Sequence, residues 1–141
     1  MRFMVIVKED NDSEAGKLPP PELFEAMGRF NEEMVKAGIM LMGEGLLPSK
    51  DGVRVKFEGE KRTVIDGPFA ETKELIGGFW ILQCRSREEC IEWLKRAPFD
   101  GGTEIEIRQI AELEDYGDAV PQSVVEQERR LRAEIEARQQ Q

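Results

Sequence analysis

Apolar residues in the first 110 positions gather in short runs and helical stripes, separated by polar segments that contain glycine. Residues 3–7 form a continuous apolar run of strand length, which is typical of a strand buried on both faces. Polar residues 9–17 predict a loop. An apolar stripe at helical spacing then runs from Pro21, a residue suited to a first helical turn, to Gly38, suited to the position after the last turn.

The remaining pattern completes one domain. Residues 53–57 alternate between apolar and basic side chains, which predicts a half-exposed strand, and Ser86 with Glu89 three positions later is a capping box. We expect strands at 39–47, 53–57, 62–65, 78–82 and 104–108, and a second helix at 87–97. The order is strand, helix, strand, short hairpin, strand, helix, strand. This order predicts the α+β class, with the split βαβ arrangement and antiparallel sheet of a ferredoxin-like domain.

Two helices of this size cover only one face of a four-stranded sheet. Residues 3–7 and 79–82 nevertheless place large apolar side chains on both faces. A large uncovered apolar face is normally buried against something. We therefore predict a homodimer that packs sheet against sheet. The alternative is that the C-terminal segment folds over this face.

The chain is predicted to divide into an α+β domain at 1–112 and a linker with a charged helix at 113–141. In the second part, Glu and Arg recur at i,i+4 in the favourable order, as in Glu128 and Arg132. Its apolar stripe is thin and consists of Val124, Leu131 and Ile135. This pattern favours a helix that is solvated or contacts a partner, and it opens the hypothesis of a protein interaction module.

Composition narrows the classes of partner. The 141 residues carry a formal net charge of -9, which repels phosphate backbones and anionic lipid, so neither nucleic acid nor a membrane surface is predicted as a partner. The N-terminal apolar run is too short for a signal peptide, and no stretch is long enough for a membrane helix. Cys84 and Cys90 are expected to be reduced core residues of a cytoplasmic protein.

The chain contains no histidine. Catalysis by Ser-His-Asp or Cys-His groups is therefore excluded, as is a histidine-ligated metal. No metal and no cofactor is predicted. Proton transfer near neutral pH would require a carboxylate, a lysine or a tyrosine with a shifted pKa.

Asp66 is the main candidate for such chemistry. It opens the stretch Asp66-Gly67-Pro68-Phe69, in which Gly67 permits a sharp turn and Pro68 fixes the backbone angle φ. A stiff loop after a strand can hold one carboxylate in place as a general base or a ligand contact. The alternative is architectural: Asp66 accepts hydrogen bonds from the amides of its own loop, and Phe69 anchors that loop in the core.

Three further residues are candidates for ligand binding. Lys73 follows the loop and suits an anionic small molecule, although a solvated turn is the alternative. Glu44 lies between two glycines, which allow a ligand or a backbone to approach closely. Arg108 lies on one strand face with Glu104 and Glu106, and such a row is commonly solvent-exposed or paired internally.

Four segments together resemble the DGPF-domain branch of the YCII-related family: Glu44-Gly45-Leu46, Asp66-Gly67-Pro68-Phe69-Ala70-Glu71-Thr72-Lys73-Glu74, Gly77-Gly78-Phe79-Trp80 and Glu106-Ile107-Arg108. The resemblance spans residues 1–110. It implies a ferredoxin-like fold and a dimeric α+β barrel formed sheet to sheet. It also makes Arg108 a candidate partner for Asp66 or for a ligand carboxylate. It also implies a link to sigma-factor signalling, because genes of this branch often lie beside those of extracytoplasmic-function sigma factors. Some relatives resemble hydrolases or dehalogenases with a His-Asp pair, and this chain has no histidine to match it.

Three functional hypotheses follow. The first is a homodimer that binds a small molecule in a cleft beside Asp66, in a sigma-factor signalling context. The second is a histidine-free lyase, isomerase or hydrolase, in which Asp66 or Glu44 is the base and Arg108 or Lys73 stabilises an anion. The third is the interaction module formed by the C-terminal helix.

Overall fold

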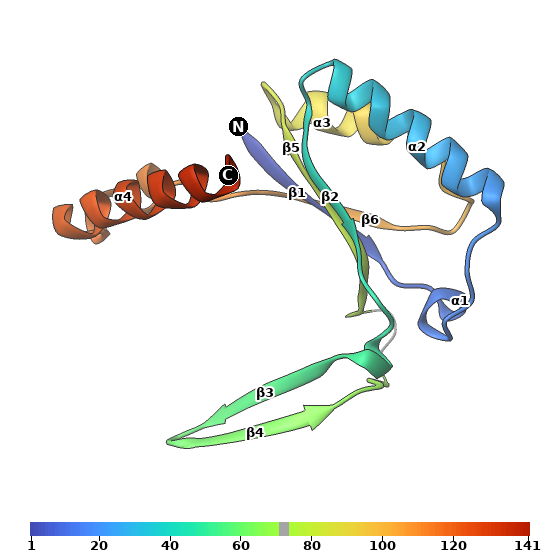
Figure 1. The fold of residues 1–141 in the computed structure, drawn as a ribbon, viewed down its shortest axis with the longest axis horizontal. Helices are drawn as coiled ribbons and strands as arrows, with labels where there is room; N and C mark the ends of the chain where they lie inside the picture. Colours follow the sequence, from blue (N-terminus) through green and yellow to red (C-terminus); the bar gives the residue numbers. More distant parts are fainter. Residues whose placement is uncertain (71–73) are drawn as a thin grey trace. The chain divides into compact units, whose positions relative to one another are not determined.

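The computed structural model describes residues 1–70 and 74–141. The chain divides into two compact units, Met1–Ile110 and Ala111–Gln141. The first unit contains, in order, β1 (Arg2–Lys8), α1 (Asn11–Glu14), α2 (Pro21–Lys36), β2 (Met40–Gly45), β3 (Val53–Glu58), β4 (Lys61–Asp66), β5 (Ile76–Gln83), α3 (Arg87–Leu94) and β6 (Ile105–Gln109) (Figure 1).

The first unit is built on a four-stranded antiparallel sheet with the order β2-β5-β1-β6. Strand β5 lies between β1 and β2, which α2 connects, and β1 lies between β5 and β6, which α3 connects. These are two interlocked split βαβ units, so the predicted ferredoxin-like α+β fold is confirmed. Figure 1 shows α2 and α3 on the same side of this sheet.

The hydrophobic core lies between the two helices and one face of the sheet. Strands β1 and β5 and helices α2 and α3 contribute these buried members: Phe3, Val5, Phe30, Met34, Trp80, Leu82, Cys90 and Leu94. The period-two alternation of β1 and β5 places these strand residues on the helix-facing side. Trp80 is central, because its ring makes edge contacts with Phe30 at 5.9 Å and Phe99 at 6.0 Å between centroids.

Local signals in the sequence set the ends of both helices. Helix α2 begins at Pro21, as predicted, and after its last turn Gly38 adopts a φ of 73°. The amide of Ile39 then donates to the carbonyl of Met34 at 2.8 Å, which satisfies one of the last helical carbonyls. Helix α3 is capped by Ser86, whose Oγ accepts from the Glu89 amide at 3.1 Å.

The opposite face of the sheet carries two cross-strand rows. In one row, Met42, Ile81, Met4 and Arg108 lie in register across β2, β5, β1 and β6. In the other row, Glu44, Phe79, Ile6 and Glu106 lie in register across the same strands. The centre of this open face is therefore apolar, while its β2 edge carries the Glu44 carboxylate and its β6 edge carries both Arg108 and Glu106.

Among the described strands, β3 and β4 pair only with each other, as a hairpin (Figure 1, green). Nearly all their side chains are exposed, including those of Val55 and Phe57. The guanidinium of Arg62 lies 4.4 Å from the centre of the Phe57 ring, which gives that ring partial cover.

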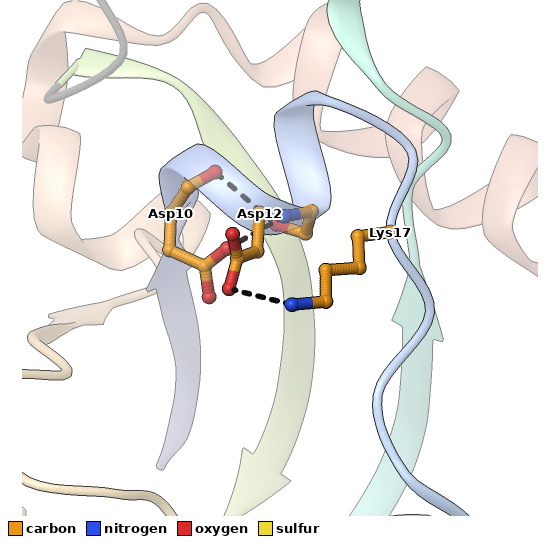
Figure 2. Close-up of polar contacts among 4 residues, drawn as sticks. Asp10, Asp12 and Lys17 are labelled. Carbon is orange, nitrogen blue, oxygen red and sulfur yellow. Dashed lines mark hydrogen bonds and ion pairs between the residues drawn. The ribbon is translucent and has the colours of Figure 1, made fainter.

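Residues 9–17 differ from the predicted loop because they contain the one-turn helix α1. Asp10 caps this turn through Oδ1, which accepts from the Ser13 amide at 2.7 Å. Lys17 closes the segment by an ion pair with Asp12 at 3.9 Å (Figure 2). The sequence did not predict this helix, because a single capped turn of polar residues has no apolar stripe.

The second unit contains a 3-10 helix at Leu113–Ala119 and α4 at Gln122–Gln139. Glu128 and Arg132 form the expected i,i+4 ion pair at 2.7 Å. The side chains of Val124, Leu131 and Ile135 are 41% to 55% exposed. Across the described residues, every helix is too short or too polar to cross a bilayer.

Cys84 and Cys90 are both buried and both free, in agreement with the sequence. Burial raises the pKa of the Cys84 thiol. Burial also raises the pKa of Cys90 to about 12, and the neighbouring Cys84 adds to this rise. The two thiols are therefore protonated at neutral pH and poor nucleophiles.

We predict that these thiols resist alkylation in the folded protein and make stability depend on pH. Because the folded pKa lies above the ordinary value of 9.0, the contribution to stability is complete below pH 9 and is lost as pH rises toward 12. Urea unfolding at pH 7 and pH 10.5 measures the loss, and Cys90→Ala should reduce this pH dependence. A Cys90→Ala variant with the same dependence as the wild type would contradict the prediction.

Candidate functional site

A cavity of about 230 Å³ lies on the helix-facing side of the sheet, where β2 and β5 are rich in glycine. Helix α2 contributes Met27 and Asn31, and the segment after α3 contributes Phe99. The full lining is Val7, Met27, Asn31, Gly43, Glu44, Gly45, Gly77, Gly78, Phe79, Trp80 and Phe99.

Glycines create the space for this cavity. The register pairs Gly43 with Trp80 and Gly45 with Gly78, so both pairs share the helix-facing side. A Cβ on Gly43 would lie 2.7 Å from Trp80 Cδ1, so only glycine lets the indole lie against β2. A Cβ on Gly45 would meet nothing within 4 Å. Gly43 therefore lets the Trp80 ring pack against β2 as a wall of the cavity, and Gly45 leaves the space beside it unfilled.

Asn31 is the polar side chain held against this wall. The indole Nε1 of Trp80 donates a hydrogen bond to Asn31 Oδ1 at 3.0 Å. Because indole nitrogen is only a donor, this contact fixes which end of the amide is oxygen. Among the described residues, no buried side-chain nitrogen or oxygen lacks a hydrogen bond, and the Trp80 contact is the hydrogen bond described for Asn31. The Asn31 NH₂ is therefore accessible and has two donors to offer.

Glu44 lines the cavity from β2, but its carboxylate belongs to the other face of the sheet. It is in register with Phe79 and alternates with Gly43, whose Cβ direction is toward Trp80. The Glu44 side chain is exposed at the edge of the open face. Glu44 therefore lines the cavity with its backbone, and its carboxylate lies outside the cavity.

Asp66 lies at a different place, at the end of β4 and opposite Val53. Its side chain is exposed, and Asp66 is not among the lining residues of the cavity. In the part of the chain that the structure describes, the loop hydrogen bonds do not involve its carboxylate. The amide of Gly67 donates to Gly52 O at 2.9 Å, and the amide of Phe69 donates to Ser49 Oγ at 3.0 Å.

Ser49 organises the Asp66–Phe69 loop. Its amide donates to Glu14 Oε2 at 3.1 Å, and its hydroxyl donates to Glu14 Oε1 while accepting from Phe69. A Cβ on Gly67 would lie 1.7 Å from Ser49 O, so no other residue fits there without movement. The peptide bond between Gly67 and Pro68 is cis. The motif thus locks the base of the hairpin onto α1 and the 3-10 helix at Ser49–Asp51.

Phe69 anchors this loop, but not through the hydrophobic core as the sequence suggested. Its ring is half-buried, close to Gly52, and the Arg54 guanidinium lies 3.8 Å from the ring centre. A cation over an aromatic face stabilises a partly exposed ring. Arg54 of the hairpin therefore covers the Phe69 ring, whereas the sequence predicted that the hydrophobic core would cover it.

The three predicted site residues that the structure describes lie apart from one another within a single chain. Glu44 lies on β2 and Arg108 on β6, and these are the two outer strands of the sheet. Asp66 belongs to the separate hairpin. Lys73 lies outside the described residues. Within the described ranges, no group of three or more carboxylates and thiols is placed to hold a metal ion.

Asn31 and Phe99 were missed by the sequence, and Trp80 was assigned to the core alone. Trp80 is a core residue, only 5% exposed, but its edge also forms the cavity wall. One signal for Asn31 was available. It lies four residues after Met27 and three before Met34, so it is a polar residue within the apolar stripe of α2.

The fold and this cavity define a ferredoxin-like α+β protein with a preformed pocket between its sheet and its first long helix. The profile of the YCII-related domain matches residues 1–114, and the chain belongs to this family.

Two similar proteins illustrate the likeness. An uncharacterised protein of Rhizobium meliloti (strain 1021), R00369, is 33% identical over 69 residues, which are 49% of this chain and 56% of that protein. A structure of 5-chloro-2-hydroxyhydroquinone dehydrochlorinase (TftG) from Burkholderia phenoliruptrix AC1100, in complex with 2,5-dihydroxybenzoquinone, is 18% identical. That match covers 81% of this chain and 98% of TftG, with a TM-score of 0.42.

We predict that Gly67→Ala destabilises the protein, because the added methyl group must displace the Ser49 carbonyl. Overpacking of this kind costs about 1–3 kcal/mol in the free energy of unfolding. Gly28→Ala is the matched control, since a Cβ there meets nothing and helix interiors favour alanine by about 1 kcal/mol. Urea unfolding curves compare the two variants. Equal stability of Gly67→Ala and the wild type would show that the loop yields freely.

Proposed function

We propose that this protein binds a small organic molecule in the cavity between α2 and the sheet. The observation that carries the proposal is the cavity itself, about 230 Å³ in volume, with Trp80 and Phe99 as walls and the Asn31 amide on one side. An engineered apolar cavity of about 150 Å³ is known to hold benzene. A space of this size therefore suits one substituted ring.

This site replaces the cleft that was expected beside Asp66. Its walls combine apolar side chains with one oriented polar group, which is the usual composition of a small-molecule site. Asp66 is not among its lining residues, and the Asp66–Phe69 loop is accounted for by its contacts with Ser49.

Binding is better supported than catalysis. Glu44 is the one carboxylate residue among the described lining residues, and strand alternation turns its side chain to the other face. A carboxylate base within the cavity therefore has no support in the described part of the chain. The link to sigma-factor signalling and the interaction role of residues 113–141 stay predictions.

We further propose that two copies of the chain pack through the open face of the sheet. Its apolar centre, with Met4, Phe79 and Ile81, needs cover of matching size and chemistry. A second copy of the same face offers an apolar centre of equal size, and this match supports a homodimer that packs sheet against sheet.

We predict that filling the cavity abolishes binding of small neutral ring compounds. Gly45→Val adds a side chain where a Cβ meets nothing within 4 Å, and valine suits a strand. Leu41→Val, on the same strand and 51% exposed, is the control. Saturation-transfer NMR with a set of single-ring fragments should detect binders of the wild type and Leu41→Val that Gly45→Val loses. Fragments that bind all three proteins equally would place the binding site elsewhere.

We also predict that a charge in the apolar centre of the open face weakens the dimer. Ile81→Asp would bury an unpaired carboxylate between the two sheets and should raise the dimer dissociation constant at least about tenfold. Val55→Asp, on the exposed hairpin, is the control and should leave the constant unchanged. Sedimentation equilibrium measures the constants, and circular dichroism checks that both variants fold. A monomeric wild type at micromolar concentration refutes the dimer, and an Ile81→Asp variant that dimerises as tightly as the wild type refutes this interface.

A further inference from the structure

We infer that the ligand of the cavity is an uncharged ring compound with a carbonyl-type acceptor, and that Asn31 Nδ2 is the donor that recognises it. This inference rests on the proposed function, because it names the ligand class of the same cavity. The residues that carry it are Asn31, Trp80, Phe99, Gly43 and Gly45.

The first step concerns the orientation of the amide. Trp80 Nε1 donates to Asn31 Oδ1 at 3.0 Å, so the amide cannot exchange the positions of its oxygen and its NH₂ group without losing that bond. Oδ1 therefore already has a partner, whereas the NH₂ group has none among the described residues. A ligand that satisfies this NH₂ group must present an acceptor.

The second step concerns the rigidity of the donor. The Trp80 indole is held by edge contacts with Phe30 and Phe99, and the absence of a Cβ at Gly43 lets it lie against β2. The amide is thus held from two sides, by its own position on α2 and by a fixed indole. A donor that is already oriented loses little conformational entropy when a ligand binds.

The third step concerns charge. Neither lysine nor arginine is among the described lining residues, and the whole chain has a net charge of -9. An anion would leave water without a cationic partner, which costs free energy. A cation would lack an ionised carboxylate in the cavity, because Glu44 turns away. A neutral acceptor opposite the aromatic walls is the chemistry that remains.

Three probes of equal ring size separate the contribution of the hydrogen bond from that of charge. Acetophenone carries the carbonyl acceptor, α-methylstyrene replaces that C=O by C=CH₂, and benzoate replaces the methyl ketone by an anion. We expect acetophenone to bind the wild type about three- to tenfold more tightly than α-methylstyrene, as one neutral hydrogen bond allows. Benzoate should bind more weakly than acetophenone. NMR titration gives the three dissociation constants.

Two variants isolate the donor. In Asn31→Asp, a carboxylate oxygen still accepts from Trp80 Nε1 but the NH₂ group is gone, so the preference for acetophenone over α-methylstyrene should disappear. Glu32→Gln is the control on the exposed side of α2, where Glu32 pairs with Lys36, and it should keep the preference. An independent measurement uses the wild type alone: acetophenone should shift the Asn31 side-chain NH₂ resonances, and α-methylstyrene should not.

The outcomes distinguish this inference from the proposed function beneath it. Equal affinity for acetophenone and α-methylstyrene, or tighter binding of benzoate, overturns the ligand class while leaving the cavity as a binding site. A preference that survives in Asn31→Asp, or unshifted NH₂ resonances, overturns the role of Asn31. If none of the three probes binds the wild type, both the proposed binding site and the ligand class are refuted.

Discussion

The packing of the Trp80 ring is the contact on which both the core and the cavity depend. The ring lies between Phe30 and Phe99 and against the bare backbone of Gly43, while its Nε1 holds the Asn31 amide. A large aromatic side chain with one polar atom can satisfy an apolar core and a polar site at once. One indole therefore couples the stability of the domain to the shape of its pocket.

The Asp66–Phe69 loop belongs to a second, separate system of constraints. Glu14, Ser49 and the Phe69 amide form a polar chain that holds the base of the hairpin, and Gly67 fits where no side chain can. The hairpin forms a sheet of its own among the strands that the structure describes, and an isolated two-stranded ribbon is marginally stable. The Asp66–Phe69 loop therefore holds this ribbon in place, and its glycine and proline serve that packing role.

Much of the fold could be predicted, because the relevant signals are local. Pro21, Gly38 and Ser86 act within one turn of chain, and the alternation in β1 and β5 reports burial directly. The candidate site was harder. Glu44 was noted for its flanking glycines, and these glycines do open the cavity, but the carboxylate itself turns to the opposite face. Helix α1 was missed because one capped turn carries no periodic pattern.

The sequence by itself determined the α+β class, the strand order of a ferredoxin-like sheet and the exclusion of histidine chemistry, since each follows from composition or short-range pattern. Only the tertiary structure decided which residues meet. Asn31 and Trp80 are 49 positions apart and become partners because α2 packs on β5. Glu44 and Arg108, by contrast, are separated onto opposite edges of one sheet. Such proximity depends on strand register and helix packing, which no local signal encodes.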